Sequence, residues 1–381
     1  MRILHFCFTL DTSRGGVSSG TLNLVKQLTK YGIKNQIVST GNTVDQIRRN
    51  LKIQSDFDSI GVEYIHTISK FENDYGLGSL KGLRKRLEYL SKPDLVVLHQ
   101  IYTVSTLIGF IYAKKYKIPF AVMPHGSLTK YHESDSKIRK AVAKWLVISK
   151  ILREAEAIIV TCESERDDLT IALKSKAFLL KYGAIARNSD SELEQSLPID
   201  LQKNYIVFSG RFDKKKNLNL VIMAMPQILE IYPDLILNVA GSGNVKEIRT
   251  MRNLVSALKL ERNVRFLGWI DNSKMSEVLA SARLLVLPSE NENFAIVVAE
   301  ALSAGVPCVI SKFVGTADII VKHHAGEVIE ELTPTSVAKG VIKVLQGDQK
   351  MYRDAAFDAV EHSLNWSQIA LEWKALITSL A

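Results

Sequence analysis

The sequence predicts an α/β protein with two doubly wound parallel sheets in tandem, and three observations predict this fold class. The chain has 381 residues, which exceeds the length that one hydrophobic core usually organises. Short apolar segments alternate with longer helical or polar segments, as in parallel strands joined by crossover helices. A polar stretch at residues 189–203 shows neither pattern and separates two such series. We therefore expect two Rossmann-like domains joined by a linker.

The first series begins with a buried-type strand and a glycine-containing loop, RILHFCFTL followed by DTSRGGVSSG. A helix comes next, carrying Leu22, Leu24, Val25 and Leu28. Four further apolar segments predict strands: NQIVSTGN, DLVVLHQ, IPFAVMPHG and AEAIIVTCES. Together these elements define an N-terminal domain over residues 1–190.

The second series predicts a C-terminal domain over residues 204–362. Its strands are expected at NYIVFSG, LILNVAG, NVRFLGW, ARLLVLPS and PCVISK. A final helix over residues 366–381 has six apolar residues on one face: Trp366, Ile369, Ala370, Trp373, Leu376 and Ile377. Since that face must be buried, we expect the helix to pack back on the N-terminal domain.

The net charge of +9 is unevenly distributed, because residues 1–190 carry 29 Lys and Arg against 18 Asp and Glu. Two basic runs, at residues 81–86 and 137–144, could attract nucleic acid, anionic lipid or a polyanionic acceptor. A solvated helix face is the alternative for each run. Of these partners we expect a polyanionic acceptor or an anionic membrane surface, and no nucleic acid.

Two features bear on where the protein resides. The stretch Leu95–Ala113 has no charged residue over 19 positions, but its polar side chains are costly in hydrocarbon. We interpret it as a buried strand followed by a helix, with a transmembrane helix as the alternative. Cys7, Cys162 and Cys308 are widely spaced in apolar contexts, which is typical of buried reduced thiols. We expect a cytoplasmic protein, with peripheral attachment to the cytoplasmic face of the membrane as a further hypothesis.

The most specific motif is PSENENFAIVVAEALSAGVPCV at residues 288–309, where a strand, a polar turn and a helix follow one another. The pattern places Glu292 at the helix entrance and Glu300 well inside the helix. A helical rise of about 1.5 Å per residue then separates them by roughly 12 Å. Two carboxylates so spaced can accept hydrogen bonds from the hydroxyls of one extended ligand. The alternative is that Glu292 caps the helix and Glu300 faces solvent.

A basic loop follows the first strand of the C-terminal domain, in FSGRFDKKKN at residues 208–217. It places Arg211 and Lys216 at the carboxyl end of the sheet, where open α/β sheets bind ligands. An arginine fork and a lysine charge suit a diphosphate leaving group. A solvated basic loop is the alternative.

Two features of the N-terminal domain also indicate ligand contacts. Gly15 and Gly16, in the first loop, would let backbone N–H groups approach a phosphate, although simple turn chemistry explains a Gly-Gly pair equally well. His125 ends the strand IPFAVMP and precedes Gly126, so we expect it at the carboxyl edge of the sheet, facing a cleft. An ordinary polar loop histidine is the alternative.

In combination these motifs resemble the retaining GT-B glycosyltransferases of family 4. The C-terminal domain carries the resemblance through the Glu292 and Glu300 pair, GRFDKKKN, VAGSGN, VRFLGWI and SAGVPCVIS. In the N-terminal domain RGGV, PHGSL and VTCES carry it less strongly. The resemblance implies the GT-B fold, two doubly wound Rossmann-like domains facing across a cleft. It also implies sugar transfer from a nucleotide-diphosphate sugar to a hydroxyl acceptor, such as a lipid-linked, polysaccharide or lipopolysaccharide intermediate.

The resemblance also implies roles for individual residues. Glu300 would hold the ribose, Glu292 the donor sugar, and the segment from Gly268 to Ile270 the base. The residues implied in the chemistry are His125, Arg211, Lys216 and Glu292. Those implied in donor binding are Gly15, Gly16, Gly268, Trp269, Ile270, Asn293, Phe294, Ala295 and Glu300.

The chain departs from the family pattern at three positions. Relatives usually carry Gly where this chain has Asn293 and Ala295, and often Asn where it has Tyr182. A catalytically silent nucleotide-sugar-binding or scaffold protein is therefore an alternative. A NAD-dependent dehydrogenase is disfavoured because GSGN at residues 241–244 lacks the GxGxxG continuation. No Asp-x-Asp cluster is positioned to chelate a metal with a diphosphate, so we expect no metal ion and no cofactor.

Overall fold

The computed structural model describes residues 1–10, 16–39, 57–59, 61–66, 87–88, 90–129, 138–184, 204–270 and 272–380. The chain divides into two compact units. The first unit comprises Met1–Tyr182 and Trp366–Ala381, and the second comprises Gly183–Asn365. The predicted linker at 189–203 lies outside the described residues.

The first unit contains a seven-stranded parallel sheet with the order β3-β2-β1-β4-β5-β6-β7. The chain winds outward from β1 in one direction and then from β4 in the other, so a topological switch point lies between these two strands. The strands are β1 (Arg2–Cys7), β2 (Lys34–Ser39), β3 (Glu63–His66), β4 (Leu95–His99), β5 (Phe120–Met123), β6 (Ala157–Val160) and β7 (Ala177–Leu179). The helices are α1 (Gly16–Lys30), α5 (Val104–Tyr116), α7 (Ile138–Glu154), α8 (Glu163–Asp168), α9 (Ile171–Lys174) and α17 (Trp366–Leu380).

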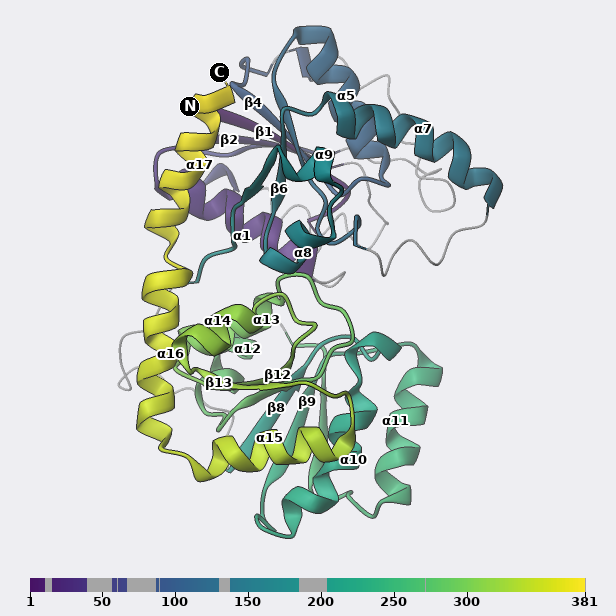
Figure 1. Cartoon of the computed structure of the whole chain (residues 1–381), viewed down its shortest axis with the longest axis vertical. Coiled ribbons are helices and arrows are strands. Elements are labelled where there is room, and N and C mark those ends of the chain that lie inside the picture. The colour runs from purple at the N-terminus through teal and green to yellow at the C-terminus, as the bar shows by residue number, and fades with distance from the viewer. Residues whose placement is uncertain are drawn as a thin grey trace. The chain divides into compact units, whose positions relative to one another are not determined.

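The second unit repeats this topology with a six-stranded parallel sheet of order β10-β9-β8-β11-β12-β13. Figure 1 shows α10 and α15 on one face of this sheet and α13 and α14 on the other. The strands are β8 (Tyr205–Ser209), β9 (Ile236–Ala240), β10 (Val264–Gly268), β11 (Leu285–Leu287), β12 (Cys308–Ser311) and β13 (Gly326–Ile329). The helices are η2 (Lys214–Lys216), α10 (Leu218–Leu229), α11 (Val245–Ala257), α12 (Asn272–Ala280), α13 (Ile296–Ser303), α14 (Ala317–His323), α15 (Pro334–Gln346) and α16 (Gln349–Ser363). Two doubly wound parallel sheets, as predicted, are therefore confirmed.

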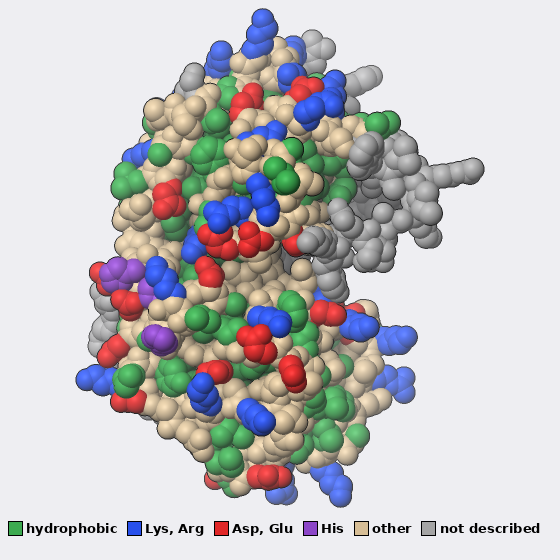
Figure 2. All heavy atoms as spheres, viewed as in Figure 1, with side chains coloured by type: hydrophobic (Ala, Val, Ile, Leu, Met, Phe, Trp, Pro, Cys, Tyr) green, Lys and Arg blue, Asp and Glu red, His purple; other side chains and the backbone are tan. Residues whose placement is uncertain are grey.

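Surface charges of both signs are mixed rather than segregated on the face shown in Figure 2, where Lys and Arg side chains lie among Asp and Glu side chains. The predicted basic runs at 81–86 and 137–144 lie outside the part of the chain whose side chains the structure describes. Within the described residues, no helix combines the length and the apolar character that crossing a bilayer requires. The uncharged stretch Leu95–Ala113 is instead divided between β4 and α5, as the strand-and-helix interpretation predicted.

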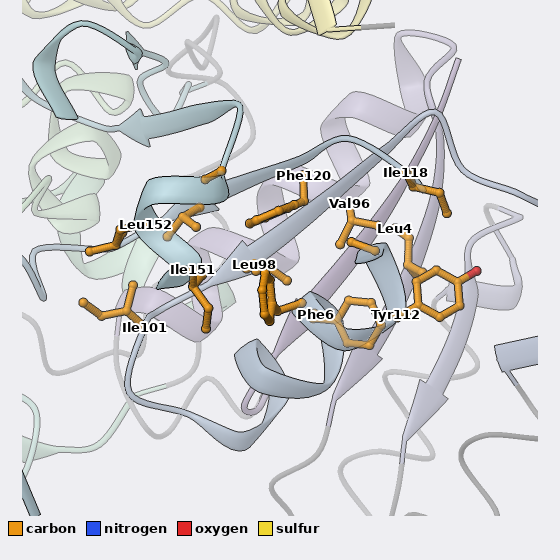
Figure 3. Close-up of a cluster of buried hydrophobic side chains, with 14 of the residues drawn as sticks. Leu4, Phe6, Val96, Leu98, Ile101, Tyr112, Ile118, Phe120, Ile151 and Leu152 are labelled. Carbon is orange, nitrogen blue, oxygen red and sulfur yellow. The ribbon is translucent and has the colours of Figure 1, made fainter. Parts of the chain in front are cut away.

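The core of the first unit is built from the alternating side chains of its central strands (Figure 3). Leu4 and Phe6 of β1 and Val96 and Leu98 of β4 have no solvent exposure. Helix α5 can pack closely on these strands because Gly109 has no side chain. A Cβ atom at this position would collide with Leu98 and Phe6. All three cysteines are buried and unpaired, as predicted.

The C-terminal helix α17 belongs to the first unit, where it contacts α1. The apolar face predicted for this helix is confirmed, since all six of its residues are buried: Trp366, Ile369, Ala370, Trp373, Leu376 and Ile377.

Candidate functional site

Three neighbouring loops of the second unit are joined through their backbones at the carboxyl edge of the sheet. Gly210 follows β8, Gly241 follows β9 and Gly268 ends β10. The N–H of Gly241 donates to the carbonyl of Gly268 at 2.7 Å. Gly241 has a φ of 127°, and a Cβ atom there would collide with the carbonyl of Gly210. This edge is where doubly wound sheets bind ligands.

Lys216 and Glu292 meet at this edge, although 76 positions separate them in the sequence. The Nζ atom of Lys216 contacts Oε2 of Glu292 in an ion pair. The two side chains are largely withdrawn from solvent, with exposed fractions of 13% and 19%. A lysine and a carboxylate from two separate motifs are thus brought into one site.

The backbone around this pair fixes its position. Asn217, in the left-handed conformation at φ 54°, donates from Nδ2 to the carbonyl of Pro288 at 3.0 Å. The N–H of Glu290 donates to the carbonyl of Lys215 at 2.7 Å. These two bonds connect the loop after β8 to the loop after β11. Each loop therefore holds its half of the Lys216–Glu292 pair in place.

Arg211 lies apart from this ion pair. Its guanidinium is 3.3 Å from the carboxylate of Asp213, and its side chain is 63% exposed. It extends from the same loop as Lys216 but remains accessible to a ligand. Of the two cations proposed for a diphosphate clamp, Lys216 is the one in contact with Glu292.

The predicted position of Glu292 at a helix entrance is wrong. Helix α13 begins only at Ile296, and Ala295 directly before it has a φ of 58°, a left-handed conformation outside the helix. Glu292 instead forms a short bridge with the segment after β12, in which its N–H donates to the carbonyl of Phe313 at 3.1 Å. Because residues 292–295 are not helical, the helical rise does not give the separation of Glu292 from Glu300.

The other donor-binding candidates of the second unit lie between Asn293 and Glu300 and at the end of β10. Glu300 lies within α13 and is partly exposed, as is Asn293, whereas Phe294 and Ala295 are buried. Gly268 has a φ of 74°, and Trp269 beside it is 52% exposed. A half-exposed indole next to the joined loops offers a flat apolar face to a ligand. Ile270 is partly exposed in the same segment.

The glycine candidates of the first unit fall at the start of α1. Gly16 is the first residue of that helix and is exposed, whereas Gly15 lies outside the described residues. His125 follows β5 in a tight turn, where it and Gly126 have positive φ values of 53° and 79°. The carboxylate of Glu165 accepts hydrogen bonds from the N–H groups of Gly126 and Thr161, at 2.5 and 2.9 Å. Glu165 is buried and holds this turn in place.

The imidazole of His125 lies between His99 and Tyr182. Its Nε2 atom is 2.9 Å from Nδ1 of His99, and its Nδ1 atom is 3.2 Å from the hydroxyl of Tyr182. The three rings are nearly parallel, at 16° and 9°. Desolvation by burial lowers the pKa of His125 to about 3, so the ring is neutral at physiological pH.

Several residues around the His125 turn were not identified from the sequence. His5, Asn35, His99 and Glu165 are buried polar residues that connect to the His125 turn. His99 ends the strand LVVLH, as His125 follows the strand IPFAVM, and that shared position at two strand ends was a usable signal. Within the described ranges, no group of three or more His, Cys, Asp or Glu side chains is arranged to hold a metal ion.

Two family models match adjacent parts of the chain. The model described as Glycosyltransferase Family 4 matches residues 14–175, and the model described as Glycosyl transferases group 1 matches residues 189–359. The D-inositol 3-phosphate glycosyltransferase of Corynebacterium glutamicum is 23% identical over 385 residues, covering 95% of this chain and 91% of that protein. The phosphatidyl-myo-inositol mannosyltransferase of Mycobacterium tuberculosis is 28% identical over 176 residues, covering 44% of this chain and 45% of that protein.

The fold is also similar to solved structures. The crystal structure of Anabaena HepE in complex with UDP and glucose aligns with a TM-score of 0.78 at 16% identity and covers 100% of both chains. At this identity the likeness concerns the fold.

Proposed function

The chain belongs to the GT-B glycosyltransferases of family 4, and from this premise we propose that it transfers a sugar from a nucleotide-diphosphate sugar to a hydroxyl acceptor with retention of configuration. The observation that carries the proposal is the ion pair between Lys216 and Glu292 at the carboxyl edge of the second sheet. Both residues come from motifs that the family resemblance assigns to donor binding. The family and the fold class predicted from these motifs are confirmed.

The two members of the ion pair can bind two different parts of a nucleotide-sugar donor, its diphosphate and its sugar. When a diphosphate enters, the Lys216 ammonium can pair with its oxygens and Glu292 can turn to the hydroxyls of the donor sugar. Arg211, which is exposed, adds a second cation to the leaving group. We propose Glu300 as the acceptor of ribose hydrogen bonds and Trp269 as the surface on which the base lies.

We propose a front-side reaction in which one phosphate oxygen serves as leaving group and base. The bond between the anomeric carbon and the β-phosphate oxygen breaks, and the electron pair remains on the phosphate. The acceptor oxygen forms the new bond on the same face, and its proton passes to the departing phosphate. The cations Lys216 and Arg211 stabilise the negative charge that develops on the diphosphate. This chemistry needs no metal ion.

For the acceptor we propose a hydroxyl on a lipid-linked or polysaccharide intermediate at the cytoplasmic membrane surface. The relative from M. tuberculosis is named for mannosyl transfer to a phosphatidylinositol. Exposed apolar side chains on the first unit support membrane contact, with Leu107 and Ile111 on α5 and Leu146 and Val147 on α7. Co-sedimentation with anionic vesicles at low salt is expected; equal recovery with neutral vesicles would remove the anionic surface from the proposal, and no recovery with either kind of vesicle would remove the membrane.

The test of the function is transfer or hydrolysis of nucleotide sugars by the wild type and by Glu292→Gln. A thermal-shift panel of nucleotide diphosphates first identifies the base, since a ligand that binds only the folded state raises the apparent stability. We expect Glu292→Gln to lower kcat by about 10²–10³-fold, the usual cost of losing one preorganised polar contact at a reacting centre. The exposed neighbour Glu290 offers the matched control, Glu290→Gln, with activity near that of the wild type.

A catalytically silent nucleotide-sugar-binding protein is the second candidate. It is motivated by Asn293 and Ala295, whose side chains occupy positions where relatives usually carry glycine and so narrow the donor pocket. Such a protein would show a thermal shift with one nucleotide sugar but the same turnover in the wild type and in Glu292→Gln. Turnover that depends on Glu292 excludes it.

A further inference from the structure

Three histidines from separate elements of the first unit form one continuous series of hydrogen bonds. Nδ1 of His5 on β1 is 3.0 Å from Nε2 of His99, at the end of β4. Nδ1 of His99 is in turn 2.9 Å from Nε2 of His125, after β5. A neutral imidazole has one N–H donor and one acceptor nitrogen, so each contact needs a donor facing an acceptor. All hydrogen bonds of the series must therefore have the same donor-to-acceptor direction. If the donor of one bond is known, the donors of the others follow.

Asn35 on β2 sets this direction. Its Nδ2 atom is 2.8 Å from the carbonyl oxygen of Ile33 and 2.9 Å from the hydroxyl of Thr29. That hydroxyl is already committed as a donor to the carbonyl of Val25, at 2.8 Å. Because a carbonyl only accepts, the nitrogen of the Asn35 amide must face Ile33, and its oxygen must face His5. Oδ1 of Asn35, 3.0 Å from Nε2 of His5, therefore accepts a hydrogen bond from an N–H at Nε2, so His5 carries its proton on that nitrogen.

The proton position of His5 determines the donors and acceptors along the rest of the series, from Asn35 at its inner end to Tyr182 at its outer end. With its proton on Nε2, His5 accepts at Nδ1 from the Nε2–H of His99. His99 then accepts at Nδ1 from the Nε2–H of His125. The hydroxyl of Thr21 also approaches Nδ1 of His99, but at the longer distance of 3.4 Å. Nδ1 of His125 is left as an acceptor, and the Tyr182 hydroxyl, 3.2 Å away, donates to it.

Burial keeps the whole series neutral. Desolvation lowers the pKa of His5 to about 4 and that of His99 well below its usual range, as it does for His125. None of the three rings is therefore a cation near pH 7, and the alternating order of donors and acceptors is retained.

We propose that Asn35, acting through His5 and His99, is a positioning residue that fixes the proton of His125 on Nε2 and leaves Nδ1 as an acceptor at the carboxyl edge of the sheet. A ligand group that replaces the Tyr182 hydroxyl at Nδ1 must then be a hydrogen-bond donor, such as a sugar hydroxyl. An unprotonated diphosphate oxygen has no proton to donate and is rejected at this atom. This selection of ligand rests on the proposed function, whereas the proton order belongs to the free protein.

Long-range ¹H–¹⁵N spectra of the ¹⁵N-histidine-labelled full chain test the proton order directly, because the two tautomers and the imidazolium give distinct ¹⁵N shifts. Single His→Gln variants assign the signals. We expect the Nε2–H tautomer for His5, His99 and His125 at pH 7. An Nδ1–H tautomer or an imidazolium at any one of the three would overturn the proposal.

Two variants separate the inner end of the series from the outer end. Tyr182→Phe removes the outer donor and keeps the stacked ring, so we expect His125 to remain in the Nε2–H form. Asn35→Leu removes the inner acceptor at similar volume, and we expect a measurable Nδ1–H population at His125. If Tyr182→Phe changes the tautomer, the outer end sets the order and the proposal fails. If Asn35→Leu does not fold, the wild-type and Tyr182→Phe spectra still decide.

Parallel transfer assays keep this inference distinct from the proposed function. Asn35→Leu with reduced kcat/KM but an unchanged His125 tautomer would overturn the role of Asn35 and leave the glycosyltransferase function standing. A wild type with the expected tautomers but no transfer from any nucleotide sugar would refute the function and leave the proton order standing.

Discussion

Tyr182 stands where relatives of the family often carry asparagine, and the structure gives this difference a physical meaning. Its ring lies parallel to that of His125 at a centroid distance of 6.3 Å, and its hydroxyl is 3.2 Å from Nδ1 of the same histidine. An asparagine offers no comparable stacking surface. The segment after β7 is thereby connected to the turn after β5 by a single side chain.

The buried histidines predict that acid destabilises the protein. The pKa of His5 is lowered from about 6.5 to about 4, so the unfolded state binds more protons than the folded state between these values. The stabilising contribution is complete above pH 6.5 and is lost as the pH falls toward 4. For His5 alone it amounts to about 3 kcal/mol, since one pKa unit is worth about 1.4 kcal/mol. His99, His125, Tyr182 and Glu165 share this environment.

Urea unfolding measured from pH 7.5 to pH 4.5 checks this prediction. The free energy of unfolding should fall steadily with pH in the wild type and less steeply in His5→Gln, which cannot charge. Equal slopes for the two proteins would show that His5 titrates normally in the folded state.

At the scale of elements, the joined glycine loops of the second unit give a prediction for stability. Gly241→Ala both strains the backbone and collides with the carbonyl of Gly210, whereas Gly268→Ala meets no atom within 4 Å. Backbone strain costs about 1–2 kcal/mol in either variant, and the collision adds about 1–3 kcal/mol in Gly241→Ala alone. Thermal unfolding should therefore place Gly241→Ala clearly below Gly268→Ala, and equal losses would contradict the contact between the loops.

The sequence could predict the central elements but not the peripheral ones. Strands such as DLVVLHQ are buried on both faces and show as unbroken apolar runs. The strands at EYIH, AFL and GEVI are short and lie at or near the sheet edges, so little apolar signal marks them. The apolar pattern predicts a helix that includes Phe294, but the left-handed conformation of Ala295 delays the helix to Ile296, and this is why Glu292 is not at its entrance.

The residues of the candidate site could be predicted from the sequence only where they belong to recognisable motifs. Lys216 and Glu292 belong to motifs that the family resemblance identifies. His5, Asn35 and His99 have no such motif, and only the folded sheet brings them beside His125.

At the scale of the whole molecule, the first unit includes α17, which follows the entire second unit in the sequence. Trp373 of α17 has no exposed surface, whereas Leu371 of the same helix is 57% exposed. We expect Trp373→Ala to lower the free energy of unfolding by about 3–5 kcal/mol, the usual cost of removing a buried aromatic ring.

Hydrogen exchange resolved by segment checks this expectation. Exchange should accelerate in α1 and in the strands of the first unit in Trp373→Ala, and Leu371→Ala provides the control with little change. Acceleration confined to the second unit would contradict the assignment of α17 to the first.

The return of α17 also bears on the order of events during synthesis. The second unit lies between residues 1–182 and α17 in the sequence, so the ribosome makes residues 1–182 well before the helix that contacts α1. Until α17 is made, the first unit lacks the helix whose apolar face is buried in the complete unit. Released chains truncated before Trp366 should therefore carry a folded second unit and an incomplete first one, and chaperones would find their binding surface on the first unit.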